Sequence, residues 1–437
     1  MKYNNQNRKT KNTNLAYKNN ELQDFEIIEK IGRGTFSTVY KVRHKKHNEI
    51  YAMKVIEKRP GEGEKEQTKQ IKREIDNLLK CYHWGKNYNT VKLFNFFDTK
   101  DQYVLIFNYC DTTLEEYVKE KYPNNKMPLK DIKLLFLQLN QGFQNLYEEN
   151  VIHRDIKINN ILIEYRFGDK NDYIPRLADF GISRENSTEN NPMTASISWL
   201  LLSAPEILVD GTDYSFKSDL WSIGVLLYKL AFGKYPYEGK GPIQIYSQIM
   251  NGPNKLEKSG DKNFDDLIKR LLHKDKEMRI NYIDYFNHPF FKFNEPESVV
   301  IFNEQYNMKI SSYNREFRVE SCNGNGLLKD LCYVEFVKLI ELNLQFCEIS
   351  DLNPLTHDIF KNLKFINLQY NRITNLMPLQ KAKFLDLIEL YLGLNQITDI
   401  SPLENIPFRR LKILGLAGNH ITNDDEFRRI YNKLISH

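Results

Sequence analysis

Little in this sequence points to a membrane, a metal cluster or a disulfide framework. No apolar run approaches the ~18 residues needed to span a bilayer, and the polar, basic N-terminus shows no secretory signal. The five cysteines are scattered without a C-x-x-C pair, which leaves a zinc site unsupported. This pattern favours reduced thiols and predicts a cytoplasmic or nuclear location. No charge of one sign dominates, because 62 basic residues face 57 acidic ones. The net charge of +5 therefore gives no reason to expect nucleic acid or a membrane as a partner.

The 437 residues contain enough apolar material, 41% of the chain, for globular cores over most of its length. Residues 1–24 differ, because they are rich in Asn and Lys and predict a disordered basic tail. Short β-type runs follow, interrupted by one amphipathic helix over Gln70–Lys80; the runs are Phe25–Ile31, Thr38–Val42, Tyr51–Ile56, Val91–Phe97 and Tyr103–Tyr109. From about Leu114 to Phe291 the pattern is mostly helical. This order predicts a small β-rich lobe followed by a larger helical lobe.

The last third of the chain is periodic. Residues 292–326 have weak periodicity and predict a connector. A 24-residue frame then recurs, with a leucine opening each copy, an Asn or Cys eight residues later and an isoleucine two residues after that. The positions are Leu339, Leu363, Leu387, Leu411; Cys347, Asn371, Asn395, Asn419; and Ile349, Ile373, Ile397, Ile421. The apolar spacing alternates, so an amphipathic helix does not explain it.

This frame resembles L-x-x-L-x-L-x-x-[N/C]-x-I of the leucine-rich repeats, which implies a short α/β solenoid over residues 327–437. In such repeats the leucines point inward and stack, while the Asn or Cys turns the backbone. Both ends of a short array need covers. Residues 327–338 are expected to cover the first end, and the helical-looking Asp424–Ile435 the second.

A glycine-containing segment, Ile31-Gly32-Arg33-Gly34-Thr35-Phe36-Ser37-Thr38-Val39, joins two expected strands. Residues without a Cβ let a backbone approach phosphates closely, so that its N–H groups can bind their oxygens. Alone the segment is weak evidence, because a flexible hairpin would look the same and Ser37 stands where a third glycine would.

The next strand carries Lys54 among apolar residues. A buried ammonium is costly unless it is paired, and a phosphate or a carboxylate would serve. Glu74, on the expected helix, is the obvious carboxylate. The alternative is a lysine on an edge strand in water.

A polar loop lies about a third of the way along the chain, His153-Arg154-Asp155-Ile156-Lys157-Ile158-Asn159-Asn160. Asp155 could accept the proton of an attacking hydroxyl, and Asn160 could bind magnesium through its amide oxygen. Lys157 could steady the charge of a transferring phosphoryl group. Asp179, opening Asp179-Phe180-Gly181, would supply a second oxygen ligand for the metal.

The order of these motifs resembles that of the eukaryotic protein kinases. The resemblance continues through Ala204-Pro205-Glu206, Asp219-Leu220-Trp221, Arg279 and His288-Pro289-Phe290-Phe291, and it covers residues 25–291. It implies that Arg279 pairs with Glu206, as the corresponding residues of the family do. It implies an α+β, bilobal fold and the use of ATP and Mg²⁺. The family's nucleotide-binding residues correspond to Ile31, Gly32, Gly34, Val39, Ala52, Lys54, Phe107, Tyr109, Cys110 and Leu162.

The resemblance also implies roles for the polar residues. Lys54, anchored by Glu74, would hold the α and β phosphates. Asp155 would be the catalytic base, with Asn160 and Asp179 as the metal ligands. Lys157 is placed as in serine/threonine kinases, which predicts that the protein phosphorylates serine and threonine. The alternative is dual specificity.

Two departures from the family pattern, and one residue that conforms to it, bear on structure and regulation. Residues 165–174 form an insertion that predicts a longer hairpin. Trp199 stands where serine/threonine kinases place a threonine that positions the catalytic groups, although a shift of one residue would put Ser198 there. Arg154 beside the base is typical of kinases controlled by loop phosphorylation, with ordinary polar residues as the alternative; the candidates are Ser187, Thr188, Thr194, Ser196 and Ser198.

The repeats are expected to recruit a protein partner or substrate through the exposed face of their strands, with Phe365, Tyr370 and Tyr391 as anchors. The alternative is that the array only packs on the kinase lobe. For the whole chain, the rival of an active kinase is a pseudokinase scaffold, which Trp199 favours and the complete set of polar residues disfavours.

Overall fold

The computed structural model describes residues 22–34, 37–58, 63–81, 89–166, 168–179, 197–210, 214–252, 256–292, 296–320, 322, 324–406 and 408–435. The chain divides into two compact units, Met1–Lys292 and Phe293–His437. The expected tail over 1–24 lies outside the described residues except for Leu22–Asp24, a short 3-10 turn. None of the helices in the described ranges is long and apolar enough to cross a bilayer.

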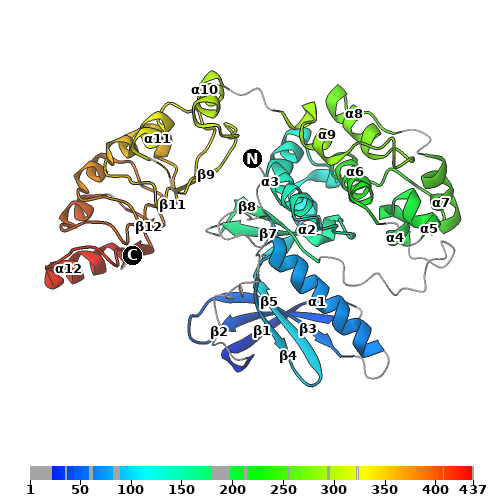
Figure 1. Ribbon diagram of the computed structural model, residues 1–437, viewed down its shortest axis with the longest axis horizontal. Coiled ribbons are helices and arrows are strands. Elements are labelled where there is room, and N and C mark those ends of the chain that lie inside the picture. The colour runs from blue at the N-terminus through cyan, green and yellow to red at the C-terminus, as the bar shows by residue number, and fades with distance from the viewer. Residues whose placement is uncertain are drawn as a thin grey trace, which may run out of the picture. The chain divides into compact units, whose positions relative to one another are not determined.

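The first unit begins with a five-stranded antiparallel sheet in the order β1-β2-β3-β5-β4 (Figure 1). Its strands are β1 (Phe25–Arg33), β2 (Ser37–His44), β3 (Ile50–Glu57), β4 (Leu93–Asp98) and β5 (Gln102–Asn108). They match the expected runs to within about two residues at most ends. The helix α1 (Gly63–Cys81) buries Ile71 and Leu78 in the same core as Leu105 of β5. It begins seven residues before the predicted Gln70–Lys80.

The helical lobe follows and is built around α6. Its helices are α2 (Leu114–Lys121), α3 (Leu129–Glu148), α4 (Ile197–Leu202), α5 (Pro205–Asp210), α6 (Phe216–Phe232), α7 (Pro242–Asn251), α8 (Lys262–Leu271) and α9 (Tyr282–Phe286). Trp221 of α6 is fully buried, as are most of the helix's other side chains. This confirms the predicted β-rich lobe followed by a helical lobe.

The ends of α6 are set by local chemistry. Ser215 and Ser218 form a capping box at the N-terminal end. At the C-terminal end Gly233 has φ 71°, and a Cβ there would lie 2.6 Å from the carbonyl oxygen of Asn124. Only glycine fits this position, so α6 stops there.

The first unit also contains a three-stranded sheet in the order β6-β7-β8. Its strands are β6 (Thr112–Thr113), β7 (Ile161–Arg166) and β8 (Asp169–Leu177). The β7 and β8 strands pair as an antiparallel hairpin in which Tyr165 faces Tyr173. The longer hairpin predicted over residues 165–174 is thereby confirmed. Tyr173 packs on α2, where its ring centroid lies 4.9 Å from that of Tyr117.

The second unit contains a five-stranded parallel sheet in the order β13-β12-β11-β10-β9. Figure 1 shows these strands along one side of the unit and helical turns along the other. The elements are α10 (Glu297–Tyr306), β9 (Glu316–Arg318), α11 (Gly324–Leu331), β10 (Glu341–Asn343), β11 (Phe365–Asn367), β12 (Glu389–Tyr391), β13 (Ile413–Gly415) and α12 (Asp424–Ile435). Strands β10 to β13 pair in the 24-residue register of the sequence repeat.

The prediction of a connector over residues 292–326 is corrected by the structure. This segment contains α10 and β9, and β9 pairs in parallel with β10, Phe317 lying beside Leu342. This segment therefore takes the place of one more copy of the repeat, set 25 residues before the next. Sequence analysis missed it because only Cys322 matches the frame: Asn314, Phe317 and Val319 stand at leucine positions and Gly324 at the isoleucine position. Residues 327–338 consequently lie inside the sheet's span rather than covering its first end.

The asparagines of the repeat join each copy to the one before it. Asn371 accepts hydrogen bonds at Oδ1 from the backbone N–H groups of Cys347 (3.0 Å) and Ile349 (2.9 Å). Its Nδ2 donates to the carbonyls of Leu344 (2.8 Å) and Leu368 (3.0 Å). Asn395 and Asn419 repeat this pattern. The side chain thus satisfies backbone groups that would otherwise be buried without partners.

Substituting Asn371 with alanine is expected to lower the free energy of unfolding of the second unit by about 3 kcal/mol, because the buried N–H groups of Cys347 and Ile349 lose their acceptor. Urea denaturation of the full chain measures the change. Asn405→Ala, at an exposed asparagine of the same unit, is the control and should change it by less than about 0.5 kcal/mol. Equal losses in the two variants would show that the Asn371 contacts do not stabilise the sheet.

Candidate active site

A cavity of about 270 Å³ lies between the sheet β1–β5 and the helical lobe. Nine of the ten residues predicted to bind a nucleotide line it: Ile31, Gly32, Val39, Ala52, Lys54, Phe107, Tyr109, Cys110 and Leu162. Gly34, although described, is outside this lining; its N–H donates to the carbonyl of Ser37 (2.8 Å) and closes the turn between β1 and β2. The structure thus gathers residues from across 130 positions of the sequence around one space.

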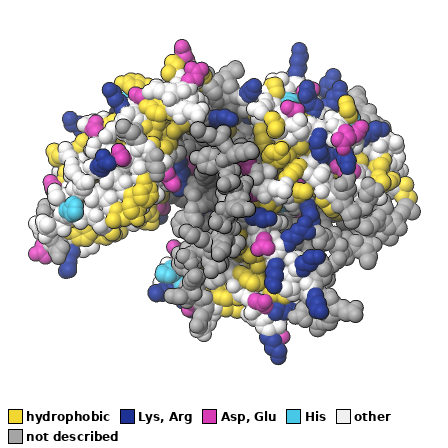
Figure 2. All heavy atoms as spheres, in the orientation of Figure 1, with side chains coloured by type: hydrophobic (Ala, Val, Ile, Leu, Met, Phe, Trp, Pro, Cys, Tyr) yellow, Lys and Arg dark blue, Asp and Glu magenta, His cyan; other side chains and the backbone are white. Residues whose placement is uncertain are grey.

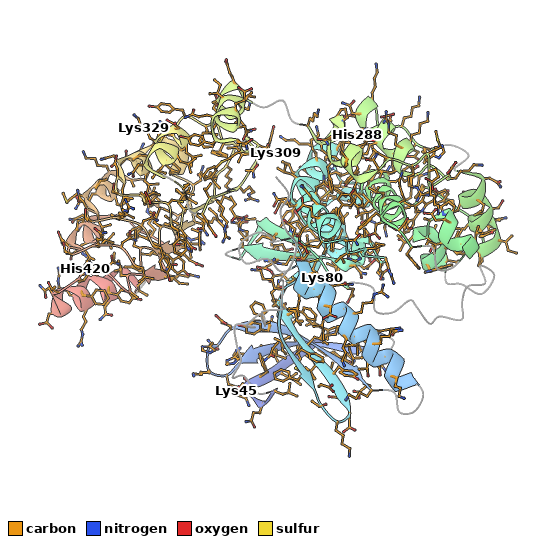
Figure 3. The ribbon with its side chains drawn as sticks, in the orientation of Figure 1. Lys45, Lys80, His288, Lys309, Lys329 and His420 are labelled. Atoms are coloured by element: carbon orange, nitrogen blue, oxygen red, sulfur yellow. The ribbon has the colours of Figure 1, made fainter. Side chains whose placement is uncertain are left out.

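The ammonium of Lys54 lies between two carboxylates at the wall of this cavity. Its Nζ is 2.7 Å from Oδ1 of Asp179 and 3.7 Å from Oε1 of Glu74. Lys54 projects from β3, Glu74 from α1 (whose end Lys80 is labelled in Figure 3), and Asp179 follows β8. The predicted Lys54–Glu74 pair is therefore present, and Asp179 joins it.

The charges of this cluster affect one another. Burial by itself lowers the pKa of Lys54, but the carboxylates of Asp179 and Glu74 outweigh it, so the net pKa is above the ordinary value. Lys54 in turn holds the pKa of Asp179 below its usual range. Burial raises the pKa of Glu74 to about 7, because Lys54 offsets it only in part. Lys54 therefore stays charged and suited to bind an anion.

The catalytic loop forms a second cluster around Asp155. Nζ of Lys157 is 2.8 Å from Oδ2 of Asp155. Nδ2 of Asn160 donates to the same oxygen at 2.8 Å and to the backbone carbonyl of Asp155 at 2.9 Å. The three residues assigned to proton acceptance, charge stabilisation and metal binding are thus in direct contact.

Asp219 of α6 fixes the backbone of this loop through hydrogen bonds. The backbone N–H groups of His153 and Arg154 donate to its two oxygens at 2.8 Å and 2.9 Å. Burial raises the pKa of Asp219 to about 6, although the two donors partly offset the effect. Arg154 has φ 70°, a left-handed conformation that is uncommon outside glycine. The contact fixes the backbone immediately before Asp155.

Asn160 and Asp179 fit the magnesium site that the sequence resemblance implies. Asn160 uses Nδ2 for its contacts with Asp155, which leaves the amide oxygen for a cation. The N–H of Ala178, next to Asp179, donates to the carbonyl of Asn160 at 2.9 Å, so the two segments adjoin. Magnesium prefers such hard oxygen ligands and retains several waters, so one carboxylate and one amide oxygen suffice from the protein.

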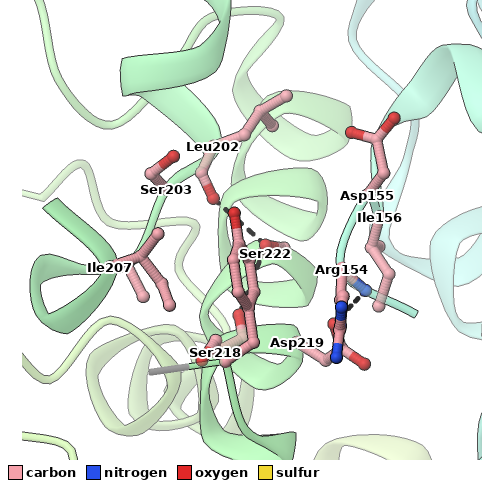
Figure 4. A pocket seen from close by; sticks show the side chains of 11 residues that line it. Arg154, Asp155, Ile156, Leu202, Ser203, Ile207, Ser218, Asp219 and Ser222 are labelled. Carbon is pink, nitrogen blue, oxygen red and sulfur yellow. Dashed lines mark hydrogen bonds between the residues drawn. The ribbon is translucent and has the colours of Figure 1, made fainter. Parts of the chain in front are cut away.

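The segment around Trp199 forms α4, and the half-buried indole packs against the core. A narrow space of about 10 Å³ beside Asp155 is lined from this segment by Leu202, Ser203 and Ala204 (Figure 4). Ser203 donates from Oγ to the carbonyl of Trp199 at 2.8 Å. The hydroxyl-bearing residue of the segment that lines this space is therefore Ser203, which sequence analysis did not single out.

Four candidate phosphorylation positions lie outside the described residues: Ser187, Thr188, Thr194 and Ser196. Phe180 and Gly181 lie outside them as well. The backbone of Ser198 is part of α4. Arg154, the expected partner of a loop phosphate, has its guanidinium 5.5 Å from the ring centroid of Tyr214.

A buried ion pair fixes the end of this segment. Arg279 donates to both carboxylate oxygens of Glu206, at 2.8 Å and 2.9 Å, and its side chain is fully buried. Its guanidinium also lies 5.0 Å from the ring centroid of Trp221. The pairing of Arg279 with Glu206 implied by the sequence is present in the structure.

One contact at the cavity was not predicted. Asn108 donates from Nδ2 to Oε2 of Glu164 at 2.7 Å and accepts at Oδ1 from the N–H of Lys92 at 2.8 Å. Arg176 of β8 binds the same Glu164 carboxylate. Sequence analysis gave the Asn108 side chain no role; the missing information was the β7–β8 pairing, which places Glu164 near Arg176.

Comparison with known proteins agrees with this geometry. A family model for the protein kinase domain matches residues 25–291. The chain belongs to the protein kinase family. Its relatives include mouse serine/threonine-protein kinase 36, 30% identical over 269 residues, which are 62% of this chain and 19% of that protein. An Aurora kinase of Candida glabrata is 32% identical over 278 residues, 63% of this chain and 73% of that protein.

Serine/threonine-protein kinase ULK3 of Xenopus laevis is a further relative, 31% identical over 276 residues, 62% of this chain and 55% of that protein. The chain thus spans about a fifth of the length of the mouse kinase and just over half of the frog kinase. Each match covers a length close to that of the kinase domain.

Arg279→Ala is expected to lower the free energy of unfolding of the first unit by about 3–5 kcal/mol, because the carboxylate of Glu206 is left buried and unpaired. Chemical denaturation monitored by tryptophan fluorescence measures the loss. Arg270→Ala removes an exposed ion pair with Asp266 in α8 and should cost less than about 1 kcal/mol. A loss no larger for Arg279→Ala than for Arg270→Ala would mean that the buried pair does not hold the lobe together.

Proposed function

We propose that this chain is a serine/threonine kinase that transfers the γ-phosphate of Mg-ATP to hydroxyl groups of proteins. The observation that carries the proposal is the position of Lys54 at the wall of the 270 Å³ cavity, paired with Glu74 and Asp179. A permanently charged ammonium at the end of an apolar cavity suits a nucleotide, whose base fills the cavity and whose phosphates reach the lysine.

The two ends of the cavity divide the nucleotide between them. Ala52, Leu162 and Phe107 would enclose the adenine, and the backbone of Tyr109 and Cys110 would bind its edge. The contact between Asn108 and Glu164 would hold that backbone in place. Gly32 lies at the wall without a side chain, which leaves room for phosphates beneath β1.

The catalytic loop supplies the groups for transfer. Asp155 would accept the proton of the attacking hydroxyl, and Lys157, 2.8 Å away, would offset the charge of the transferring phosphoryl group. When bound to Asn160 and Asp179, Mg²⁺ would neutralise phosphate charge. The transition state is loose, so the protein's main contribution is positioning and charge stabilisation.

Serine/threonine specificity is supported by the position of Lys157, which resembles that in serine/threonine kinases, and by the names of the relatives. A scaffold that binds partners without transfer is the second candidate, and the departure at Trp199 favours it. Phosphoryl transfer is favoured by two contacts: Lys54 pairs with Asp179, and Asn160 donates a hydrogen bond to Asp155.

Asp155→Asn is expected to reduce phosphoryl transfer by about 10²–10⁴-fold, because the proton acceptor is lost. The assay uses the full chain with Mg²⁺, γ-labelled ATP and a basic protein substrate, followed by phosphoamino-acid analysis. ATP binding should persist in this variant, since Asp155 does not line the nucleotide cavity. Asp101→Asn, at an exposed turn, is the matched control and should leave transfer unchanged.

Label on tyrosine alone would contradict the serine/threonine assignment. Transfer by Asp155→Asn at the wild-type rate would exclude Asp155 as the base. If the wild type bound no ATP and transferred no label, the scaffold would be the better account.

We further propose that the second unit is a leucine-rich-repeat array that recruits a protein partner. The parallel sheet with its 24-residue register and the asparagine contacts between copies support the repeat assignment. Hydrophobic side chains gather on this unit's surface (Figure 2). The rings of Phe365 and Tyr391 lie 5.5 Å apart on adjacent strands, both half-buried.

A second aromatic pair adjoins the strands. The rings of Phe346 and Tyr370 stack at 4.2 Å, and both side chains are nearly half exposed. Sequence analysis named Tyr370 but not Phe346. Both residues have positive φ, 55° and 56°, as do Leu394 and Gly418 at the same position of the later copies, so this conformation belongs to the turn of the repeat. The exposure of the two stacked rings supports a role in binding a partner.

Replacing Phe365 and Tyr391 together by alanine is expected to reduce retention of partner proteins at least about tenfold, since aromatic anchors contribute most of the energy of such interfaces. The measurement is a quantitative pull-down with the full chain, in which circular dichroism confirms folding. Tyr333→Ala removes an aromatic side chain that is 70% exposed but lies outside the strands, and is the control. Equal retention by all three proteins would favour the alternative that the array has no recruiting role.

A further inference from the structure

Two cysteines occupy the same position in successive copies of the repeat. The register of β9 and β10 places Phe317 beside Leu342, an offset of 25 residues. Cys322 and Cys347 are also 25 residues apart in the sequence, and both are free thiols. The later copies have asparagine at this position. The first two copies therefore carry a pair of thiols where the others carry amides.

The chain on both sides of Cys322 is in contact with Cys347. The N–H of Gly324 donates to the carbonyl of Cys347 at 2.6 Å, and a Cβ added to Gly324 would lie 2.8 Å from the Cβ of Cys347. On the other side, the sulfur of Cys347 donates to the carbonyl of Val319 at 3.4 Å. The Cys347 sulfur is thus directed toward the segment that carries Cys322.

The two thiols also contact each other. Burial, together with a hydrogen bond that the Cys322 thiol donates to Cys347, raises the pKa of Cys322 to about 12. Neighbouring strands lie about 4.8 Å apart, which falls within the range of about 4.4–6.8 Å that disulfides span between their Cα atoms. Cys322 and Cys347 each follow one of these paired strands by four residues, so a similar backbone spacing would allow a bond between their sulfurs.

We propose that Cys322 and Cys347 form an oxidation site that takes a low-molecular-weight disulfide, such as oxidised glutathione, and becomes a disulfide itself. Cys322 is half-buried and Cys347 fully buried, so the reaction begins at Cys322. Its thiolate attacks one sulfur of the oxidant, forms a mixed disulfide and releases one glutathione thiolate. Cys347 then loses its proton to water and attacks the Cys322 sulfur, releasing the second glutathione. Two protein thiols are oxidised and one glutathione disulfide is reduced.

The environment of the pair sets the conditions for the reaction. A raised pKa leaves little thiolate at neutral pH, so the exchange is slow there and speeds up as the pH rises. The bond would close a loop that contains α11 and would join the end of β9 to the end of β10. In this way oxidation would fasten the first copy of the repeat to the second.

The experiment incubates the full chain in glutathione buffers of increasing oxidised fraction at mildly alkaline pH until the product no longer changes. The samples are then acid-quenched, alkylated, digested without reduction and analysed by mass spectrometry. The expected product is a peptide pair joined through Cys322 and Cys347 that reductant separates. Oxidation should also raise the melting temperature of the second unit by about 5 °C.

Three variants make the result specific. Cys347→Asn introduces the amide found at Asn371 and Asn395, so it should fold, give no joined peptide and show no rise in melting temperature. Cys322→Ser should likewise give none. Cys332→Ser is the matched control, because the sulfur of Cys332 contacts the carbonyls of Leu328 and Pro354, and it should behave like the wild type. Three outcomes would each overturn the proposal. Both thiols could still be alkylated at the most oxidising ratio, the glutathione adduct on Cys322 could persist without forming the Cys322–Cys347 bond, or the bond could form to Cys332 instead.

Discussion

The buried carboxylate of Asp219 is the contact on which the geometry of the active site depends. It belongs to α6, the most deeply buried helix of the helical lobe, and it accepts the N–H groups of His153 and Arg154. Because Arg154 is held in a left-handed conformation, the chain turns there and brings Asp155 to the surface of the lobe's core. Asp155 then meets Lys157 and Asn160. Packing of the helical core therefore determines where the reactive groups lie.

Lys54 connects the β-rich lobe to the segment after β8 through its ion pair with Asp179. One ammonium faces two carboxylates, from α1 and from the end of β8, so the cluster carries net negative charge at high pH. Such a site favours an added cation, which agrees with metal-bound phosphates as its ligand. The raised pKa of Glu74 shows the cost of holding both carboxylates in a buried place.

Motifs predicted which residues come together at the candidate site, because kinase chemistry requires particular residue types in a set order. The 270 Å³ cavity is lined by nine of the ten residues expected to bind a nucleotide, and the ion pairs of Lys54 and Arg279 are present. Errors arose where no such requirement exists. The first turns of α1 are polar and show no apolar periodicity, and the first copy of the repeat has Asn314 in place of leucine and a spacing of 25 rather than 24. Contacts such as Asn108 with Glu164 depend on strand pairing that local pattern does not reveal.

The asparagine contacts give the second unit a direction. Each amide binds backbone groups of the copy before it, so every copy depends on its successor to satisfy its own N–H and carbonyl groups. At the β9–β10 junction a sulfur takes the place of the amide, and a thiol is the weaker hydrogen-bonding group. Among the junctions of the sheet, the one between β9 and β10 is therefore expected to open at the lowest cost in free energy, whereas amide contacts hold β10 to β13 together. The copies of this unit are thus coupled unequally along its length.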